Sequence, residues 1–368
     1  MVLRYLETVR LSRGHSSGIT ALAFSLKGQF LASAGLDGKV CIWRADDFRL
    51  LHVITRSEDI AVLSLAWLGP NEDTLICGLK DGNIVTIIVH EQEVAVHGFW
   101  AHAYPVECLV VVSPGLFASG AHTEVRVWKR PTDCTSWIQQ ADLPLPPITA
   151  YNRMDEVRVT SLHIIYPYDQ PLLVVTYLNH GMHLFDASTW EHRRSIPITG
   201  QIGDASFSPD FRTVAVSNIL SGFDVYSMDT ETALCSFGHS VRLDKLRRTP
   251  VLLVHDGLAL VGGNAQGDVH IWDVGSRRKL HSLVHRKEEV ILAIAAYYYE
   301  DSDTFVIATG ILEGNTRRGI VIWQAQELSH SHVVARRSFF AAWSRHSWNG
   351  LIIGIISFIL WYLYRKTV

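Results

Sequence analysis

Histidines are the side chains in this sequence that could most readily do chemistry, because the chain contains 18 of them. Two pairs have spacings at which both rings could reach one metal ion: His180-Gly181-Met182-His183 and His330-Ser331-His332. Neither pair is accompanied by the Asp or Cys residues that commonly complete a metal site. Both pairs lie beside predicted turns, so we predict solvated histidines and no metal ligands.

Motifs for nucleophilic, phosphate-binding or metal-assisted chemistry are absent from the sequence. It contains no GxSxG, no P-loop, no HExxH and no Gly-rich dinucleotide fingerprint. The formal charge of −3 provides no basic excess for nucleic acid. Five cysteines occur without a CxxC pair, and Cys41, Cys77 and Cys108 fall in predicted strands, which indicates buried thiols in a reducing compartment. We therefore predict no enzyme, no cofactor and no nucleic-acid partner.

The elements that position these residues repeat along the chain. Each copy has a short apolar strand, a turn, usually with glycine, and an alternating strand that ends in a large side chain, as in Leu31 to Trp43. Six further copies share this frame: 75–87, 116–128, 173–185, 214–226, 260–272 and 309–323. Spacings of roughly 40 to 57 residues suit one four-stranded propeller blade per copy. The sequence therefore predicts an all-β protein with seven blades.

These copies resemble the WD-repeat (WD40) β-propeller family. His15, preceded by a glycine, and Ser33, Asp37 and Trp43 match the family's network of buried hydrogen bonds, which ties a loop to two inner strands. The third copy has His122 near the Asp position, and copies four and five end in Phe185 and Tyr226, which leaves their register open. The resemblance implies a framework role for the residues that match in other copies: Asp81, His102, Ser119, Trp128, Trp272 and Trp323.

The resemblance also implies how the ring closes. Residues Leu3 to Leu11 alternate like a strand. In WD-repeat propellers such a leading strand becomes the outer strand of the last blade. We expect the same here, because the chain after Trp323 offers no good fourth strand. The predicted organisation is a propeller over residues 1–325, a connector over 326–346, a transmembrane helix over 347–364 and a short tail over 365–368.

Basic side chains concentrate in three segments that WD-repeat geometry would bring to one face. Two of these segments precede the sixth and seventh copies, and the third is the middle loop of the seventh. The residues are Arg242, Lys245, Arg247, Arg248, Arg286, Lys287, Arg317 and Arg318. They could form a docking patch for an acidic partner, or merely a solvated rim.

The C-terminal residues predict a membrane anchor. The stretch from Trp348 to Tyr364 carries no charge, and its 17 residues would span roughly 26 Å as a helix. Aromatic residues at its ends and basic residues outside it suit a bilayer. The predicted anchor residues are Trp348, Leu351, Ile355, Phe358, Trp361 and Tyr364. The pattern resembles a tail-anchored protein with a cytosolic propeller. The short span favours the endoplasmic reticulum over the mitochondrial outer membrane.

Three functions remain open from the sequence. The first is a membrane-tethered, non-catalytic scaffold that binds one or more cytosolic proteins, with the lipid bilayer contacted by the C-terminal helix. The second is a regulator or exchange factor for a small GTPase, because a known exchange factor at the endoplasmic reticulum combines a propeller with a C-terminal membrane helix. The third is a phosphoinositide-binding propeller, since Arg317-Arg318-Gly319 resembles the paired arginines of such a family. The fold class and the absence of catalytic motifs favour the scaffold.

Overall fold

The computed structural model describes residues 3–56, 59–89, 93–131, 136–148, 152, 154–167, 170–238, 249–263, 269–286, 289–313 and 319–327. One compact unit comprises Tyr5–Ala325; the other combines Met1–Arg4 with Gln326–Val368. None of the helices within the described ranges is long and apolar enough to cross a membrane. The predicted membrane helix, residues 347–364, and the tail lie outside those ranges, as does the connector apart from its first two residues.

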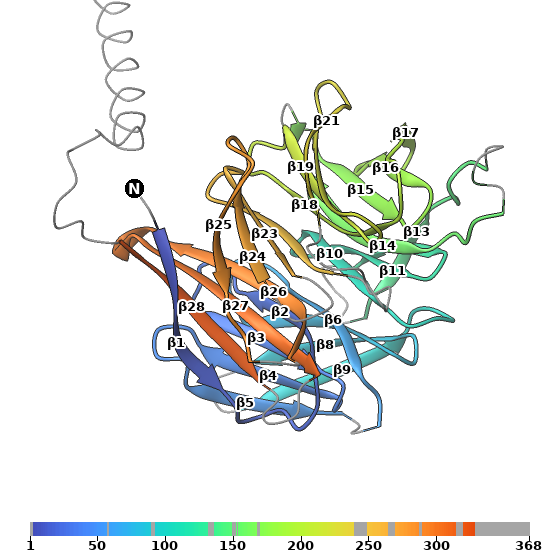
Figure 1. The fold of residues 1–368 in the computed structure, drawn as a ribbon. Helices are drawn as coiled ribbons and strands as arrows, with labels where there is room; N and C mark the ends of the chain where they lie inside the picture. Colours follow the sequence, from blue (N-terminus) through green and yellow to red (C-terminus); the bar gives the residue numbers. More distant parts are fainter. Residues whose placement is uncertain are drawn as a thin grey trace, which may run out of the picture. The chain divides into compact units, whose positions relative to one another are not determined.

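Seven four-stranded antiparallel sheets form the blades of a propeller, which confirms the predicted fold class (Figure 1). Each blade contains four strands, listed here from the innermost to the outermost: blade 1, β2 (Ile19–Phe24), β3 (Phe30–Gly35), β4 (Lys39–Arg44) and β5 (Leu50–Thr55); blade 2, β6 (Val62–Trp67), β7 (Thr74–Leu79), β8 (Asn83–Val89) and β9 (Val94–Trp100); blade 3, β10 (Cys108–Ser113), β11 (Leu116–Ala121), β12 (Glu124–Lys129) and β13 (Ile138–Asp142); blade 4, β14 (Val159–Ile165), β15 (Leu172–Tyr177), β16 (Gly181–Asp186) and β17 (His192–Ile196); blade 5, β18 (Ile202–Phe207), β19 (Thr213–Asn218), β20 (Gly222–Ser227) and β21 (Ala233–Gly238); blade 6, β22 (Val251–Val254), β23 (Ala259–Gly263), β24 (Val269–Asp273) and β25 (Arg278–Leu283); blade 7, β26 (Val290–Tyr299), β27 (Thr304–Glu313), β28 (Ile320–Glu327) and β1 (Leu3–Leu11). A 3₁₀ turn, η2 (Glu300–Ser302), lies between β26 and β27.

The N-terminal strand closes the ring, as the sequence predicted. β1 lies beside β28 as the outer strand of blade 7. Tyr5 is buried, and its hydroxyl lies 2.5 Å from Nε2 of His255 in blade 6. Arg10 pairs with the buried carboxylate of Glu289 across 2.8 Å. Chain segments almost 300 residues apart in sequence therefore hold the last blade together.

The turns between the second and third strands explain part of the recurring pattern. In blade 2 the turn after β7 contains Asp81 and Gly82, and the Asp81 carboxylate accepts a hydrogen bond from the backbone N–H of Asn83. Gly82 adopts a φ of +84°, and a Cβ there would meet the carbonyl oxygen of His102 at 2.0 Å. Only glycine fits a left-handed position with so close a neighbour.

The strand register agrees with five of the seven sequence frames. The apolar residue at the start of each frame lies directly opposite the large residue at its end, as Leu31 lies opposite Trp43. The same holds for Leu75 and Ile87, Leu173 and Phe185, Val214 and Tyr226, and Leu260 and Trp272. The frames of copies four and five, left open by the sequence, are therefore in register.

In blades 3 and 7 the tryptophan does not lie opposite the first residue of the predicted frame. Trp128 lies opposite Phe117 and not Leu116, and Trp323 lies opposite Ile307 and not Thr309. The reason is hairpin length, because the strands of blade 3 are joined by a shorter turn and those of blade 7 by a longer one. Counting the usual number of residues back from Trp128 therefore gives the wrong partner in blade 3, and in blade 7 even a frame two residues longer than the others stops two residues short of Ile307.

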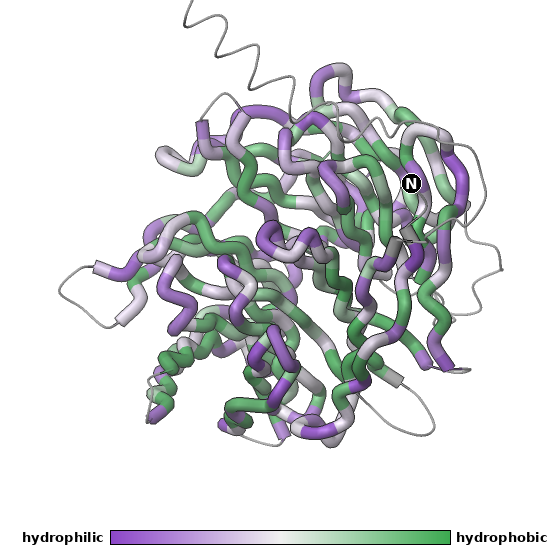
Figure 2. Tube along the Cα trace, turned by 90° about the vertical axis from the view of Figure 1, so that its left-hand side faces the viewer, coloured by the Kyte–Doolittle hydropathy of each residue, from purple (hydrophilic) through white to green (hydrophobic). Residues whose placement is uncertain are grey.

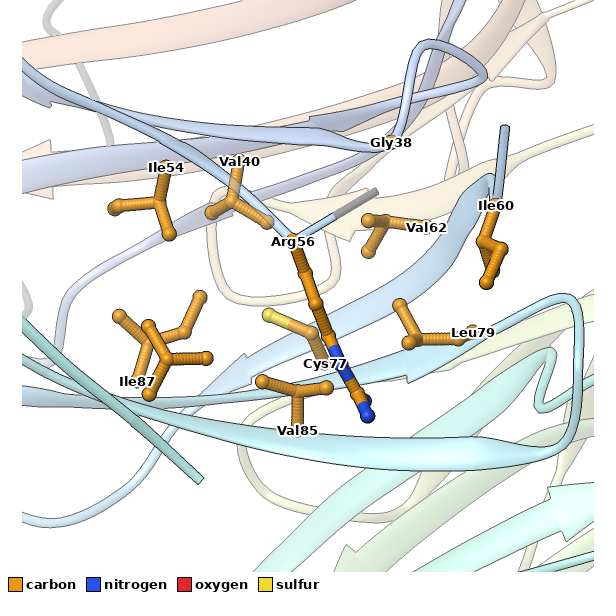
Figure 3. Close-up of a pocket in the computed structure, with 11 residues that line it drawn as sticks. Gly38, Val40, Ile54, Arg56, Ile60, Val62, Cys77, Leu79, Val85 and Ile87 are labelled. Carbon is orange, nitrogen blue, oxygen red and sulfur yellow. The ribbon is translucent and has the colours of Figure 1, made fainter. Parts of the chain in front are cut away.

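The core lies within and between the blades. Hydrophobic residues follow the strands, whereas hydrophilic residues gather in the connecting loops (Figure 2). Four cysteines, Cys41, Cys77, Cys108 and Cys235, are buried, as predicted for the first three. Figure 3 shows the seam between blades 1 and 2, where Val40 and Ile54 face Cys77 and the side chain of Arg56 lies alongside. The cavity there is about 20 Å³, enough for one water molecule and no larger ligand.

Candidate interaction surface

Blade 1 contains a complete His, Ser, Asp and Trp network. His15 Nε2 lies 2.8 Å from Ser33 Oγ, and Trp43 Nε1 donates to the same hydroxyl at 3.0 Å. His15 Nδ1 lies 3.1 Å from the Asp37 carboxylate, which also accepts the backbone N–H of Ser16. Burial by itself would raise the pKa of Asp37, but hydrogen bonds from His15 and Ser16 outweigh it and hold that pKa well below its usual range. The ionised carboxylate fixes the loop before β2 to the turn after β3.

Blade 3 builds the same network with a different acid. His102 Nε2 lies 2.6 Å from Ser119 Oγ, to which Trp128 Nε1 donates at 2.8 Å. His102 Nδ1 contacts the carboxylate of Glu124 at 2.8 Å. His122, which the sequence placed near the acidic position, contacts Glu156 instead at 3.0 Å. The longer Glu side chain reaches the histidine from the start of β12, two residues after His122.

Blade 7 contains a version of the network that the sequence analysis missed. His285 Nε2 lies 2.8 Å from Thr309 Oγ1, and Trp323 Nε1 donates to that hydroxyl at 3.0 Å. Threonine replaces serine here, and the sequence analysis placed the segment containing His285 only in the basic docking surface. A search for His, then Ser or Thr, then Trp would have found it. Trp272 of blade 6 packs instead between Phe223 and Phe237.

Stability should fall as the pH decreases from about 6.5 to about 4. Burial lowers the pKa of His285 to about 4, whereas an unfolded histidine titrates near 6.5. Unfolding therefore takes up a proton within this window, and the loss, at most about 3 kcal/mol for His285, is complete below the folded pKa. The pKa values of His102, His180, His183 and His255 are lowered for the same reason.

Thermal melts across this pH range should show a shallower slope for His285→Gln than for the unsubstituted chain. His97→Gln, at an exposed position of β9, is the matched control and should leave the slope unchanged. Equal slopes in all three proteins would contradict the assignment to His285.

The prediction that His180 and His183 are solvated is wrong, because both side chains are buried. His183 lies in a middle strand, β16, and middle strands of a propeller are covered by neighbouring blades on both faces. Its Nδ1 contacts Ser195 Oγ at 3.0 Å, and its Nε2 lies 2.9 Å from the carbonyl oxygen of His180. No cluster of three potential metal ligands occurs among the residues that the structure describes. His330 and His332 lie outside them.

The structure describes one of the eight basic residues of the predicted docking patch, Arg286, whose side chain is exposed. The others, Arg242, Lys245, Arg247, Arg248, Lys287, Arg317 and Arg318, lie outside the described ranges. The patch therefore stays a prediction. The predicted anchor residues Trp348, Leu351, Ile355, Phe358, Trp361 and Tyr364 also lie outside the described ranges.

A cluster of aromatic and charged side chains lies around the start of blade 3, and its members Trp100 and Tyr104 are exposed. The loops between blades and the hairpins between second and third strands share one face, here called the top face, because successive strands alternate in direction. Trp100, 63 % exposed, ends β9 on this face, and the Arg126 guanidinium lies 5.9 Å from its ring centre. Tyr104 stacks on His122 with ring centres 4.6 Å apart. These four residues form the blade-3 cluster.

The blade-3 cluster is suited to binding another protein. Trp, Tyr and Arg are the side chains that contribute most at protein interfaces. His122 has a left-handed backbone, with φ of 53°, in the turn after β11. The sequence analysis did not single out Trp100 or Tyr104; the signal was the aromatic density of residues 99–104 ahead of His102.

The innermost strands surround a channel of about 580 Å³. Its charged groups are paired: Arg158 contacts Glu107 at 3.0 Å, and Asp204 accepts the backbone N–H of Val251. The channel therefore offers no free acid and base pair among the described residues that line it.

Seven four-stranded blades define a β-propeller, and blades 1, 3 and 7 contain networks of His, Ser or Thr, and Trp. Residues 6–44 match the family model described as "WD domain, G-beta repeat". This match covers the end of β1 and the first three strands of blade 1, where the network is complete. WD-repeat propellers commonly bind other proteins and are generally not enzymes.

Proposed function

We propose that this protein is a non-catalytic protein-interaction scaffold, tethered to a membrane by its C-terminal segment. The observation that carries the scaffold proposal is the blade-3 cluster, where the exposed rings of Trp100 and Tyr104 present interface-type side chains on one face, with the Arg126 guanidinium beside Trp100. The polar groups that could have suggested chemistry serve instead in buried networks that hold the blades together.

The direction of β28 decides from which face of blade 7 the chain continues towards its C-terminus. β28 begins at the hairpin on the top face, so by strand direction it ends on the bottom face. A chain that continues from there into a membrane helix would leave the top face available to cytosolic proteins. We propose that the basic residues of the sixth and seventh copies recruit a partner with an acidic surface, because such charge complementarity promotes association and specificity.

Affinity purification of the full chain from detergent-solubilised membranes tests the scaffold. Charge reversal at Arg247, Arg248, Arg317 and Arg318 to Glu should remove the acidic partner. Trp100→Ala with Tyr104→Ala should weaken a partner held by the blade-3 cluster by roughly tenfold or more, as loss of interface anchors does. Arg193→Glu with Arg194→Glu, in the exposed outer strand of blade 4, is the matched charge control. An unchanged set of partners in both test variants would contradict the proposal.

Removal of residues 347–368 should convert a membrane-bound protein into one that is released from membranes. The removed stretch contains the uncharged span, residues 348–364, that is expected to insert into the bilayer, whereas the propeller closes through β1. The measurement is the fraction that pellets with membranes after a carbonate wash. Pelleting equal to that of the full chain would show that another part of the protein holds the membrane.

A further inference from the structure

The segment between β13 and β14 is unusual in length and composition. It contains 16 residues, 143–158, whereas the equivalent connections after β9 and β17 contain 7 (101–107) and 5 (197–201). Connections this long in a compact domain are commonly functional. Its first part reads Leu143-Pro144-Leu145-Pro146-Pro147-Ile148. The extra length is not required to join the two blades.

The prolines favour an extended, left-handed conformation for this segment. Each proline fixes φ near −65°, and each residue before a proline is disfavoured in the helical region. Together these two effects constrain every residue from Leu143 to Pro147. The conformation that satisfies both is polyproline II, which has three residues per turn. None of the three prolines has an N–H group with which to join a sheet.

Burial along the segment follows the same three-residue period. Leu143 and Pro146 are buried, whereas Pro144, Leu145, Pro147 and Ile148 are exposed. Leu143 packs into the core shared by blades 3 and 4, and its N–H donates to the carbonyl oxygen of Val125 at 2.9 Å. One face of the helix is therefore anchored to the propeller. The other two faces present Pro144 with Pro147, and Leu145 with Ile148.

We propose that residues 143–148 are a preformed polyproline II ligand for a separate protein domain with an aromatic-lined groove. Pro144 and Pro147 stand in the P-x-x-P spacing that such grooves accept, and the ridge of Leu145 and Ile148, 61 % and 71 % exposed, offers apolar area beside it. Because the segment is already held to the blades through Leu143, little conformational entropy remains to be lost on binding. The segment follows β13 (Figure 1), which by strand direction ends on the top face.

The charges around the segment indicate which charges the groove of the partner domain would carry. Asp142 precedes it with a 54 % exposed side chain, 3.7 Å from Arg126 Nε. Glu156, 52 % exposed, follows it in the same connection. A groove with basic residues beside its aromatic floor would complement these carboxylates. This inference rests on the proposed scaffold function, of which it names one partner class, but it concerns residues separate from the basic patch.

Binding of the full-length, detergent-solubilised chain to purified, immobilised SH3, WW and EVH1 domains tests the proposal. We expect at least one of these domains to bind, and binding to weaken roughly tenfold or more in Pro144→Ala with Pro147→Ala. A peptide of residues 141–149 should compete. Pro197→Ala with Pro209→Ala, at two exposed prolines elsewhere, is the matched control and should bind normally.

Because Pro144 and Pro147 are exposed, their replacement removes no packing and should cost only about 0.4–1 kcal/mol each through the unfolded chain, as in the control variant. Similar melting temperatures of the two double variants therefore separate lost binding from lost folding. Absence of binding by all three domain classes would overturn the proposal, as would equal binding by the two double variants. Proline-dependent self-association in sedimentation would assign the segment to a second copy and would also overturn it. None of these results would alter the outcome of the charge-reversal experiment, so the two proposals fail separately.

Discussion

Removal of residues 1–12 should prevent the propeller from forming a stable ring. β1 contributes two buried side chains, Tyr5 and Leu11, to the core of the last blade. Truncating buried side chains of this size costs about 2–5 kcal/mol each, and a whole domain is stable by only about 5–15 kcal/mol. The deletion would also leave the Glu289 carboxylate buried without Arg10, and an unpaired buried charge is strongly destabilising.

The deletion would in addition expose the edge of β28 as a row of unpaired backbone groups, which favours aggregation. The matched control is removal of residues 347–368, which takes nothing from the ring. Thermal melting and light scattering of the two truncated proteins compare them directly. Equal melting temperatures would show that β1 does not close the ring.

The sequence predicts most of the fold because the repeat combines two independent signals. Alternating apolar residues indicate strands, and a glycine turn at a fixed place between them indicates a hairpin. Both signals agree at Leu31 to Trp43, and there the predicted pairing is confirmed. In blade 7 the hairpin is longer than even the lengthened frame of 309–323, so that frame began at Thr309 and missed Ile307. Register depends on loop length, which the repeating pattern does not specify.

The candidate sites were harder to predict because they depend on neighbours that are distant in sequence. His183 looked like a turn residue, but a middle strand packed between blades buries it. Glu124 replaces the expected acid of blade 3 because its side chain reaches His102 from β12. The exposure of Trp100 is also invisible in the sequence, where an apolar alternating strand suggests packing on one face. Side-chain environments across blades arise only when the ring is assembled.

Trp43→Ala should lower the free energy of unfolding by about 3–5 kcal/mol, as removal of a large buried side chain does. Trp43 is 2 % exposed, and its indole N–H shares Ser33 Oγ with His15, so the substitution removes packing and a hydrogen bond together. Trp43→Phe separates the two effects, because it retains most of the packing and should cost only about 1–2 kcal/mol. Trp100→Ala, at an exposed position, should change stability by less than about 0.5 kcal/mol. Denaturant unfolding of the three variants gives these values, and a cost for Trp43→Ala as small as that for Trp100→Ala would show that the blade-1 network does not stabilise the ring.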